Sequence, residues 1–120
     1  MAWKNTLKKG QNIVLATSSK DSSPRAIVVV SLGFINGRLL IGACLMKKSL
    51  ENIKENNKIS IAASKGSEYY RVDGTATIYS DGKYLKIAIE KSNPPLPKAA
   101  ILIDIKEGVD LDKGKKIFEK

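Results

Sequence analysis

The sequence contains no histidine and only one cysteine, Cys44. Histidine is the usual general base and a frequent metal ligand near neutral pH, so its absence excludes His-paired nucleophiles and His-containing metal sites. A single cysteine excludes an internal disulfide and any Cys-based zinc or iron–sulfur centre, which favours a reducing, cytoplasmic compartment. We therefore expect any chemistry to depend on a bound cofactor, and the sequence assigns no catalytic residue.

Long apolar runs are also missing. No run approaches the ~20 residues that a membrane-spanning helix needs, and the first residues lead into polar ones rather than into a signal-peptide core. We expect a soluble, unprocessed protein with no membrane partner. A chain of 120 residues buries one hydrophobic core, so a single domain over residues 1–120 is expected.

Positive charge is in excess, with 21 Lys and Arg against 12 Asp and Glu. This excess favours an anionic partner: nucleic acid, an acidic membrane surface or a phosphorylated small molecule. Aromatic residues make up only 6% of the chain and are not interleaved with basic ones, which argues against a stacking platform for single-stranded nucleic acid. No metal site is expected, because Asp110 and Asp112 lack the rest of a calcium-binding frame.

Short β-type runs separated by turn residues dominate the pattern. Residues 26–32 are almost wholly apolar and β-branched, as expected of a strand buried on both faces, and Asn36-Gly37 predicts a tight hairpin to a strand over 38–43. The other predicted strands cover residues 13–17, 58–63, 69–79 and 99–105. Short helices are predicted over 49–57 and 82–90, and residues 106–120 carry no readable pattern. Six antiparallel strands at this spacing favour a small closed barrel, with a β-sandwich as the alternative.

The segment that follows residue 43 is the most informative for function. It carries Lys47, Lys48 and Ser49 into the start of a predicted helix. Free N–H groups and partial positive charge at a helix N-terminus, together with two ammonium groups, predict a phosphate site. The alternative is that Ser49 caps the helix while both lysines are solvated. Two cations in a first turn oppose the helix dipole by a few tenths of a kcal/mol, roughly, unless an anion compensates.

Small residues and one arginine lie near this segment. Gly42, Ala43 and Cys44 would let a flat ring approach the backbone, or would instead pack against a helix. Arg25 follows Pro24 at the start of the most apolar strand, where it could bind a phosphate or simply solvate the strand end.

The order of these elements resembles the FMN-binding split-barrel superfamily, which includes the pyridoxamine 5'-phosphate oxidases and small bacterial FMN-binding proteins. The resemblance extends from about residue 13 to residue 105 and is carried by residues 23–30, 40–60 and 72–76. It implies a mainly β fold, a six-stranded antiparallel Greek-key split β-barrel with two or three short helices. It also implies a homodimer with FMN at the subunit interface.

The resemblance assigns two groups of cofactor-binding residues. The group at the FMN phosphate is Lys48 and Ser49, assisted by Lys47 and Arg25. The group that lines the isoalloxazine ring is Val28, Val29, Val30, Ser31, Ala43, Cys44 and Leu45. Residues 96–99 would close the site from the partner subunit.

One departure from the family pattern limits which of the family's activities we expect this chain to share. Pyridoxamine phosphate oxidases hold their substrate with a C-terminal Arg and His pair, whereas this chain has no histidine and only lysines as basic residues in its last stretch. We therefore expect an FMN-binding oxidoreductase or electron-transfer protein with a small-molecule or protein redox partner, and not a pyridoxal phosphate synthase. The alternatives are a split barrel that binds a deazaflavin of the F420 type and a non-enzymatic basic barrel that binds nucleic acid.

Overall fold

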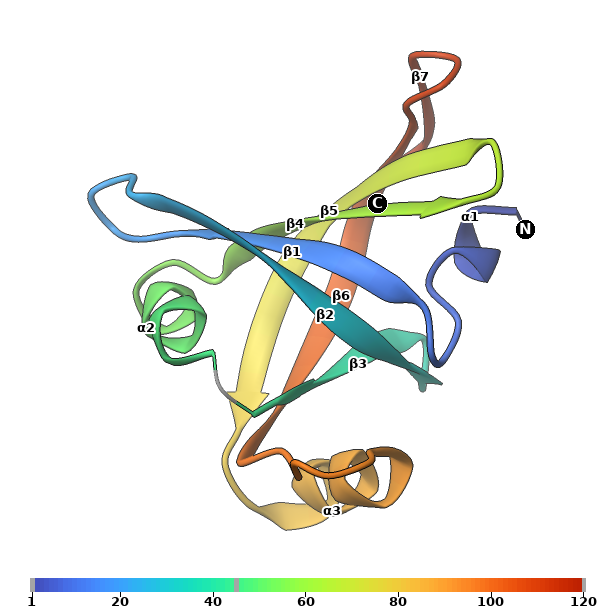
Figure 1. Ribbon diagram of the computed structural model, residues 1–120. Helices are drawn as coiled ribbons and strands as arrows, with labels where there is room; N and C mark the ends of the chain where they lie inside the picture. The colour runs from blue at the N-terminus through green and yellow to red at the C-terminus, as the bar shows by residue number, and fades with distance from the viewer. Residues whose placement is uncertain (1, 45, 120) are drawn as a thin grey trace.

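Residues 2–44 and 46–119 are described by this computed structural model, and they form seven strands and three helices (Figure 1). The strands are β1 (Asn12–Ser18), β2 (Pro24–Ile35), β3 (Arg38–Ala43), β4 (Lys58–Lys65), β5 (Glu68–Tyr79), β6 (Ala99–Asp110) and β7 (Lys115–Glu119). The helices are α1 (Ala2–Asn5), α2 (Lys47–Glu55) and α3 (Gly82–Lys91). None of these helices is long and apolar enough to cross a membrane.

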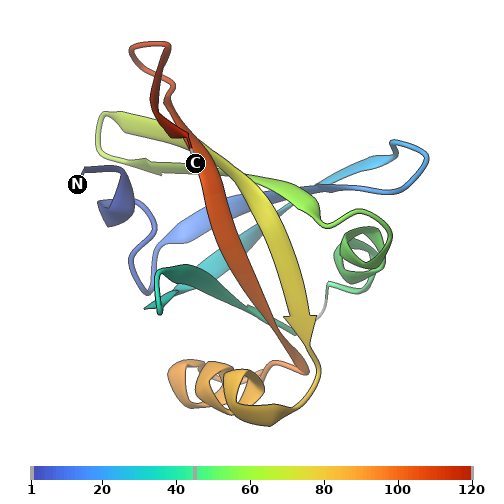
Figure 2. The ribbon, with the colours of Figure 1, turned by 180° about the vertical axis from the view of Figure 1, so that it is seen from behind.

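Six of the strands close into an antiparallel barrel. The strand order is β3-β2-β1-β4-β5-β6-β7, and β3 also pairs with β6, from Leu39 opposite Ile103 to Ala43 opposite Ala99. The chain leaves β3, passes through α2 and returns beside β1, which is a Greek-key connection. The predicted six-stranded split barrel is thus confirmed, and the β3–β6 closure excludes the sandwich (Figures 1 and 2).

The predicted tight hairpin between β2 and β3 is confirmed. Asn36 and Gly37 both have positive φ, 51° and 79°, as the two central residues of this turn type require. Ile35 then pairs with Arg38 across the turn.

The barrel interior is filled by alternate side chains of its strands, among them the fully buried Leu15, Leu39 and Ile61. A second, smaller cluster lies outside the barrel wall, where α3 packs on β3 and β6. It is formed by Leu32, Leu40, Ala88, Ala100 and Leu102. In Figures 1 and 2, α3 accordingly lies beside this wall, while α2 and α1 lie at opposite ends of the barrel.

The expectation that β2 is buried on both faces is wrong for the single chain. The side chains of Val28 and Val30 are 69% and 49% exposed, and that of Val14, which pairs with Val28, is 37% exposed. The reason is that α3 packs on β3, β6 and part of β5, while α2 contacts β1 through the inward-facing Thr17, so among the described residues no helix covers the side chains of Val14, Val28 and Val30. The barrel therefore carries an exposed apolar outer face.

Helix α2 begins two residues earlier than predicted. Met46, not Ser49, occupies the N-cap position, and the Leu50 N–H donates the helical bond to its carbonyl at 3.1 Å. Ser49 is only 2% exposed and packs toward the barrel, so its side chain does not serve as the solvent-facing helix cap that the pattern indicated.

The C-terminal stretch, unreadable from the sequence, extends β6 and adds β7. Phe118 of β7 packs against Trp3 of α1, with ring centroids 4.8 Å apart. It also lies over Gly108 of β6, where a Cβ would come within 2.5 Å of the phenyl ring. Most other β7 residues are exposed, so the strand has no apolar alternation to read.

Candidate functional site

A groove with a volume of about 550 Å³ runs along β2. One wall is formed by residues 27–32 of β2, and the opposite wall by the segment that follows α3, including Asn93 and Pro95. Lys9 and Gly10 also line the groove, as do Cys44 and Met46 from the segment between β3 and α2. Its volume lies within the usual ~300–1,000 Å³ range of small-molecule sites.

The start of α2 adjoins the groove. Met46 lines it, and Lys47 and Lys48 follow in the first helical turn with their side chains exposed. The first N–H groups of an α-helix have no intrahelical acceptor and carry partial positive charge. Lys48 makes only a long contact of 3.9 Å with Glu51, and both side chains are half-exposed, so this pair neutralises Lys48 weakly. The helix start therefore attracts anions.

A buried contact fixes α2 against the barrel. Asn52 of α2 donates from Nδ2 to Oγ1 of Thr17 in β1 at 3.1 Å, and both side chains are buried. Arg25 of β2 is the cross-strand partner of Thr17. Because residues directly opposite each other in a sheet lie on one face, Arg25 lies on the side of the sheet that α2 packs against. Helix α2 and Arg25 thus share one side of the barrel.

The main chain of β2 is available to a ligand in the groove. In the described structure, β2 pairs with β3 only from Ser31 onward, so residues 24–30 have a strand partner only on their β1 side. The main-chain groups of Ser31 point toward the segment that precedes β1. Its N–H donates to the Gln11 carbonyl at 2.9 Å, and its carbonyl accepts the Gly10 N–H at 2.8 Å. The direction of the main-chain N–H and C=O groups alternates from one residue to the next along a strand. The N–H and C=O groups of Val28 and Val30 therefore point away from β1, toward the free edge of β2.

Two of the predicted ring-lining side chains are not free to contact a ring. The side chain of Val29 is 8% exposed and belongs to the barrel core. The hydroxyl of Ser31 donates to the Leu7 carbonyl at 2.6 Å and accepts the Gly33 N–H at 3.0 Å. Both residues line the groove, and they offer it main-chain surface, whereas the prediction had assigned them both main-chain and side-chain contacts.

The end of β3 also differs from the expectation. Ala43 is 1% exposed and its side chain lies in the core, so it does not line the groove. A Cβ on Gly42 would lie 3.1 Å from the Pro97 Cβ, so the small residue allows close packing there, and Gly42 also lines the groove. Cys44 does line the groove, with its Sγ donating to the Pro95 carbonyl at 3.4 Å. Leu45 lies outside the described residues.

Residues 96–99 are mostly used within their own chain. Pro97 is buried against Gly42, and Ala99 pairs with Ala43. The side chains of Leu96 and Lys98 are exposed, so within this stretch these two are free to reach a partner's site.

Several lining residues were missed from the sequence. Lys9, Lys91, Asn93 and Pro95 come from loops and a helix end that are distant in sequence from β2. No local motif marks them, and only the closed topology brings them together.

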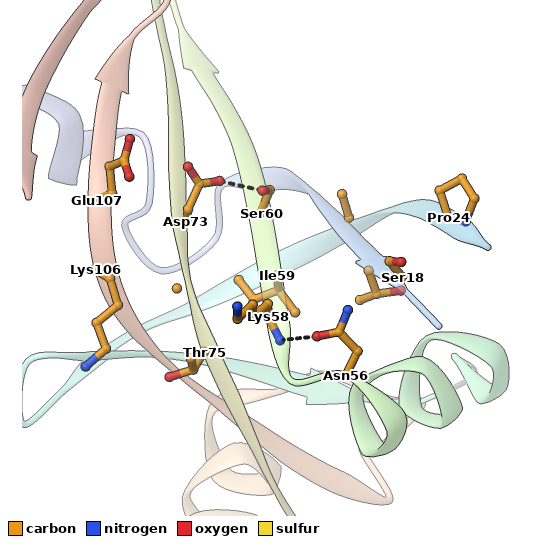
Figure 3. Close-up of a pocket in the computed structure, with 13 residues that line it drawn as sticks. Ser18, Pro24, Asn56, Lys58, Ile59, Ser60, Asp73, Thr75, Lys106 and Glu107 are labelled. Carbon is orange, nitrogen blue, oxygen red and sulfur yellow. Dashed lines mark hydrogen bonds between the residues drawn. The ribbon is translucent and has the colours of Figure 1, made fainter. Parts of the chain in front are cut away.

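A second cavity of about 580 Å³ crosses β1, β4, β5 and β6 and contains none of the predicted site residues (Figure 3). Its charged groups are largely paired. Asp73 accepts the Ser60 hydroxyl and the Arg71 Nε at 3.1 Å, and Glu107 lies 3.6 Å from Lys116. Lys106 is likewise 2.7 Å from an aspartate of its own strand. The groove along β2 is therefore the candidate site.

The sequence model of the pyridoxamine 5'-phosphate oxidase family matches residues 2–111. The uncharacterized protein MJ0282 of Methanocaldococcus jannaschii is 34% identical over 110 residues, which cover 85% of this chain and 74% of that protein.

Solved structures with the same fold include HupZ of Group A Streptococcus, with a TM-score of 0.86 at 22% identity over 98% of both chains. An FMN-binding protein of Nostoc punctiforme, related to pyridoxamine 5'-phosphate oxidase, has a TM-score of 0.65 at 15% identity and covers 91% of this chain and 78% of that one. An F420 reductase has a TM-score of 0.69 at 19% identity, over 88% of this chain and 94% of that one. At these identities the solved structures establish the fold.

Proposed function

The chain belongs to the pyridoxamine 5'-phosphate oxidase family, and from this premise we propose that its single domain binds FMN in the groove along β2. The resemblance seen in the sequence is thus confirmed at the level of the family. The observation that carries the proposal is that a groove of suitable volume runs along the free edge of β2 and that the basic start of α2 directly adjoins it.

The phosphate of FMN would bind at the start of α2. Lys47 and Lys48 supply positive charge there, and Arg25 lies on the same side of the barrel. Ser49 is buried, so its contribution would come from its main-chain N–H, the third of the helix and free of an intrahelical acceptor.

The isoalloxazine ring would lie along β2. Its edge carries carbonyl and N–H groups, which suit the outward main-chain groups of Val28 and Val30. Cys44 would contact the ring from the adjoining segment. When bound, FMN supplies hydride or electron exchange, while the protein's own groups bind it, orient it and exclude water.

A second copy of the chain would complete the site. Val14, Val28 and Val30 form an exposed apolar face, and the small side chains of Ala16 and Ala62 continue it across β1 and β4. Contiguous exposed apolar surface of this kind marks an interaction site. Because Val28 and Val30 belong both to this face and to the groove, a homodimer that covers the face would also close the groove over the flavin.

The redox partner would be a small molecule or a protein other than pyridoxamine 5'-phosphate. The Arg and His pair that the family resemblance links to that substrate cannot form in a chain without histidine. A deazaflavin is the second candidate cofactor, favoured by the structural likeness to an F420 reductase.

The test is to identify the chromophore of the purified protein. We expect a yellow protein whose released chromophore comigrates with FMN. Comigration with F420 would support the second candidate instead. A colourless protein that takes up neither added FMN nor F420 would contradict a flavin-binding function.

A further inference from the structure

The groove along β2 has two ends, and they are far apart. One end, at Ile27, adjoins the region where α2 contacts Thr17, whose cross-strand partner Arg25 lies two residues before Ile27 on β2. The opposite end lies at Ser31, whose carbonyl accepts the Gly10 N–H. The stretch from Arg25 to Ser31 spans ~20 Å at about 3.3 Å per residue. One phosphate group cannot contact both ends.

A lysine, Lys9, lies at this second end, and a second lysine, Lys91, lines the same groove. Lys9 precedes Gly10 and packs beside β2, so that a Cβ on Gly33 would lie 3.5 Å from the Lys9 Cβ. Lys91, at the end of α3, lines the groove together with Lys9. Asn93, two residues after Lys91, adds an amide to the same wall.

The charge of this end is not balanced by the protein. Among the described residues, no aspartate or glutamate lines the groove, and neither Lys9 nor Lys91 forms an ion pair. The second cavity is different, since its two carboxylates, Asp73 and Glu107, pair with Arg71 and Lys116. Unpaired ammonium groups beside a partly enclosed, largely apolar cavity attract anions.

A structural role explains one lysine but not both. A cation in the last turn of a helix interacts favourably with the helix dipole, and Lys91 occupies that position in α3. This accounts for a lysine at the helix end. It does not account for Lys9, which comes from a loop before β1 and meets the same cavity.

We infer that Lys9 and Lys91 form a second anion subsite, which takes the carboxylate or phosphate group of a small molecule sharing the groove with the cofactor. The inference rests on the proposed function, because it names the class of molecule that would meet the flavin. The first anion subsite, at Lys47 and Lys48, would remain occupied by the cofactor's own phosphate.

The test is calorimetric titration of the FMN-loaded, full-length protein with phenyl phosphate, benzoate and benzyl alcohol at constant ionic strength. These probes share one ring and differ in charge. We expect at least one anionic probe to bind about ten-fold tighter than benzyl alcohol, since a charge-assisted contact is worth about a factor of ten or more. Whichever of phenyl phosphate and benzoate binds more tightly shows whether the subsite prefers a phosphate or a carboxylate group.

The variant Lys9→Met/Lys91→Met should lose this preference while its FMN affinity changes less than about two-fold. Lys86→Met is the matched control, because Lys86 is exposed on α3 and does not line the groove. Equal binding of all three probes, an unchanged preference in the double variant, or an equal loss in the Lys86 variant would each overturn the subsite.

The same titration separates this inference from the proposed function. If the protein takes up no flavin, the proposed function fails, and phenyl phosphate is then titrated into the flavin-free protein. Binding that is lost in Lys9→Met/Lys91→Met and retained in Lys47→Met/Lys48→Met supports the second subsite on its own. Binding lost only in the latter variant, or absent altogether, overturns it.

Discussion

Asn52 in α2 donates a hydrogen bond to the hydroxyl of Thr17 in β1 at 3.1 Å, in a contact where the two side chains are 0% and 4% exposed. This bond ties the helix to the barrel at the point where β1 pairs with the start of β2. A buried polar contact therefore helps to hold the basic helix start beside the groove. Nearby Ile53 is also buried and supplies the apolar part of that interface.

Replacing Asn52 by Ala should lower the free energy of unfolding by about 1–3 kcal/mol, because the buried Thr17 hydroxyl loses its partner. Urea denaturation measures this change. In the double variant Asn52→Leu/Thr17→Val both polar partners are removed, and the Asn52 Oδ1, which has no partner in the described structure, is removed as well. The double variant should be the more stable of the two, and equal or lower stability would contradict this account.

Gly74 should not tolerate a side chain. A Cβ at this position would lie 2.2 Å from the Asp104 carbonyl oxygen, a main-chain atom of β6 that cannot rotate away. We expect Gly74→Ala to destabilise the protein by about 1–3 kcal/mol or more through overpacking. Thermal or urea unfolding measures it, with Thr77→Ala, exposed on the same strand, as control. Similar stabilities for the two variants would refute the close approach of β5 and β6.

The apolar face predicts the oligomeric state. Val28→Lys places a charge at the centre of the proposed subunit interface, where its burial is costly, so the variant should be a monomer. Sedimentation or light scattering should show that the wild-type protein is a dimer and that the Val28→Lys variant is a monomer. Leu111→Lys is the control, because Leu111 is 48% exposed but lies in the β6–β7 turn, away from the face. A monomeric wild-type protein would remove the proposed dimer.

The β1–β2 turn should respond to acid. The hydroxyls of Ser19 and Ser23 donate to the Asp21 carboxylate and lower the pKa of this group below its ordinary value, the Ser19 bond being the larger cause. The unfolded chain therefore takes up the proton first as pH falls. The contribution of Asp21 to turn stability is complete above about pH 4 and is lost as pH falls through the lowered pKa.

An NMR titration of the Asp21 carboxyl group checks this prediction directly. The turn bond from the Ser22 N–H to the Ser19 carbonyl, 3.0 Å long, should weaken over the same pH range. In Asp21→Asn that pH dependence should disappear. An ordinary or raised pKa for Asp21 would contradict the hydrogen-bonded turn.

Much of the fold was predictable because local signals agreed with it. Asn36-Gly37 defined one hairpin, and the period-two pattern of β4 and β5 defined another. The start of α2 was misplaced because Ser49 looks like a helix cap in sequence, whereas burial against the barrel determines its role. Strand β7 was invisible because its main apolar anchor, Phe118, packs against Trp3 from the far end of the chain.

The site was predictable only in part, for a different reason. Sequence could indicate that Val28 and Val30 belong to a strand at the groove, but not that the side chain of Ala43 turns inward while that of Cys44 does not. Side-chain direction at the end of a strand depends on where pairing stops. Lys9 and Lys91 were missed because no spacing relates a loop before β1 to the end of α3.

The most direct test of the account compares FMN with riboflavin, which lacks the phosphate, by fluorescence or calorimetric titration. The wild-type protein should bind FMN at least about ten-fold more tightly, and Lys47→Ala/Lys48→Ala should lose about 1.5–3 kcal/mol of FMN binding per phosphate contact while riboflavin binding is unchanged. Lys54→Ala, exposed in the last turn of α2, is the control. Equal affinities for FMN and riboflavin, or an unaffected double variant, would contradict a phosphate site at the start of α2.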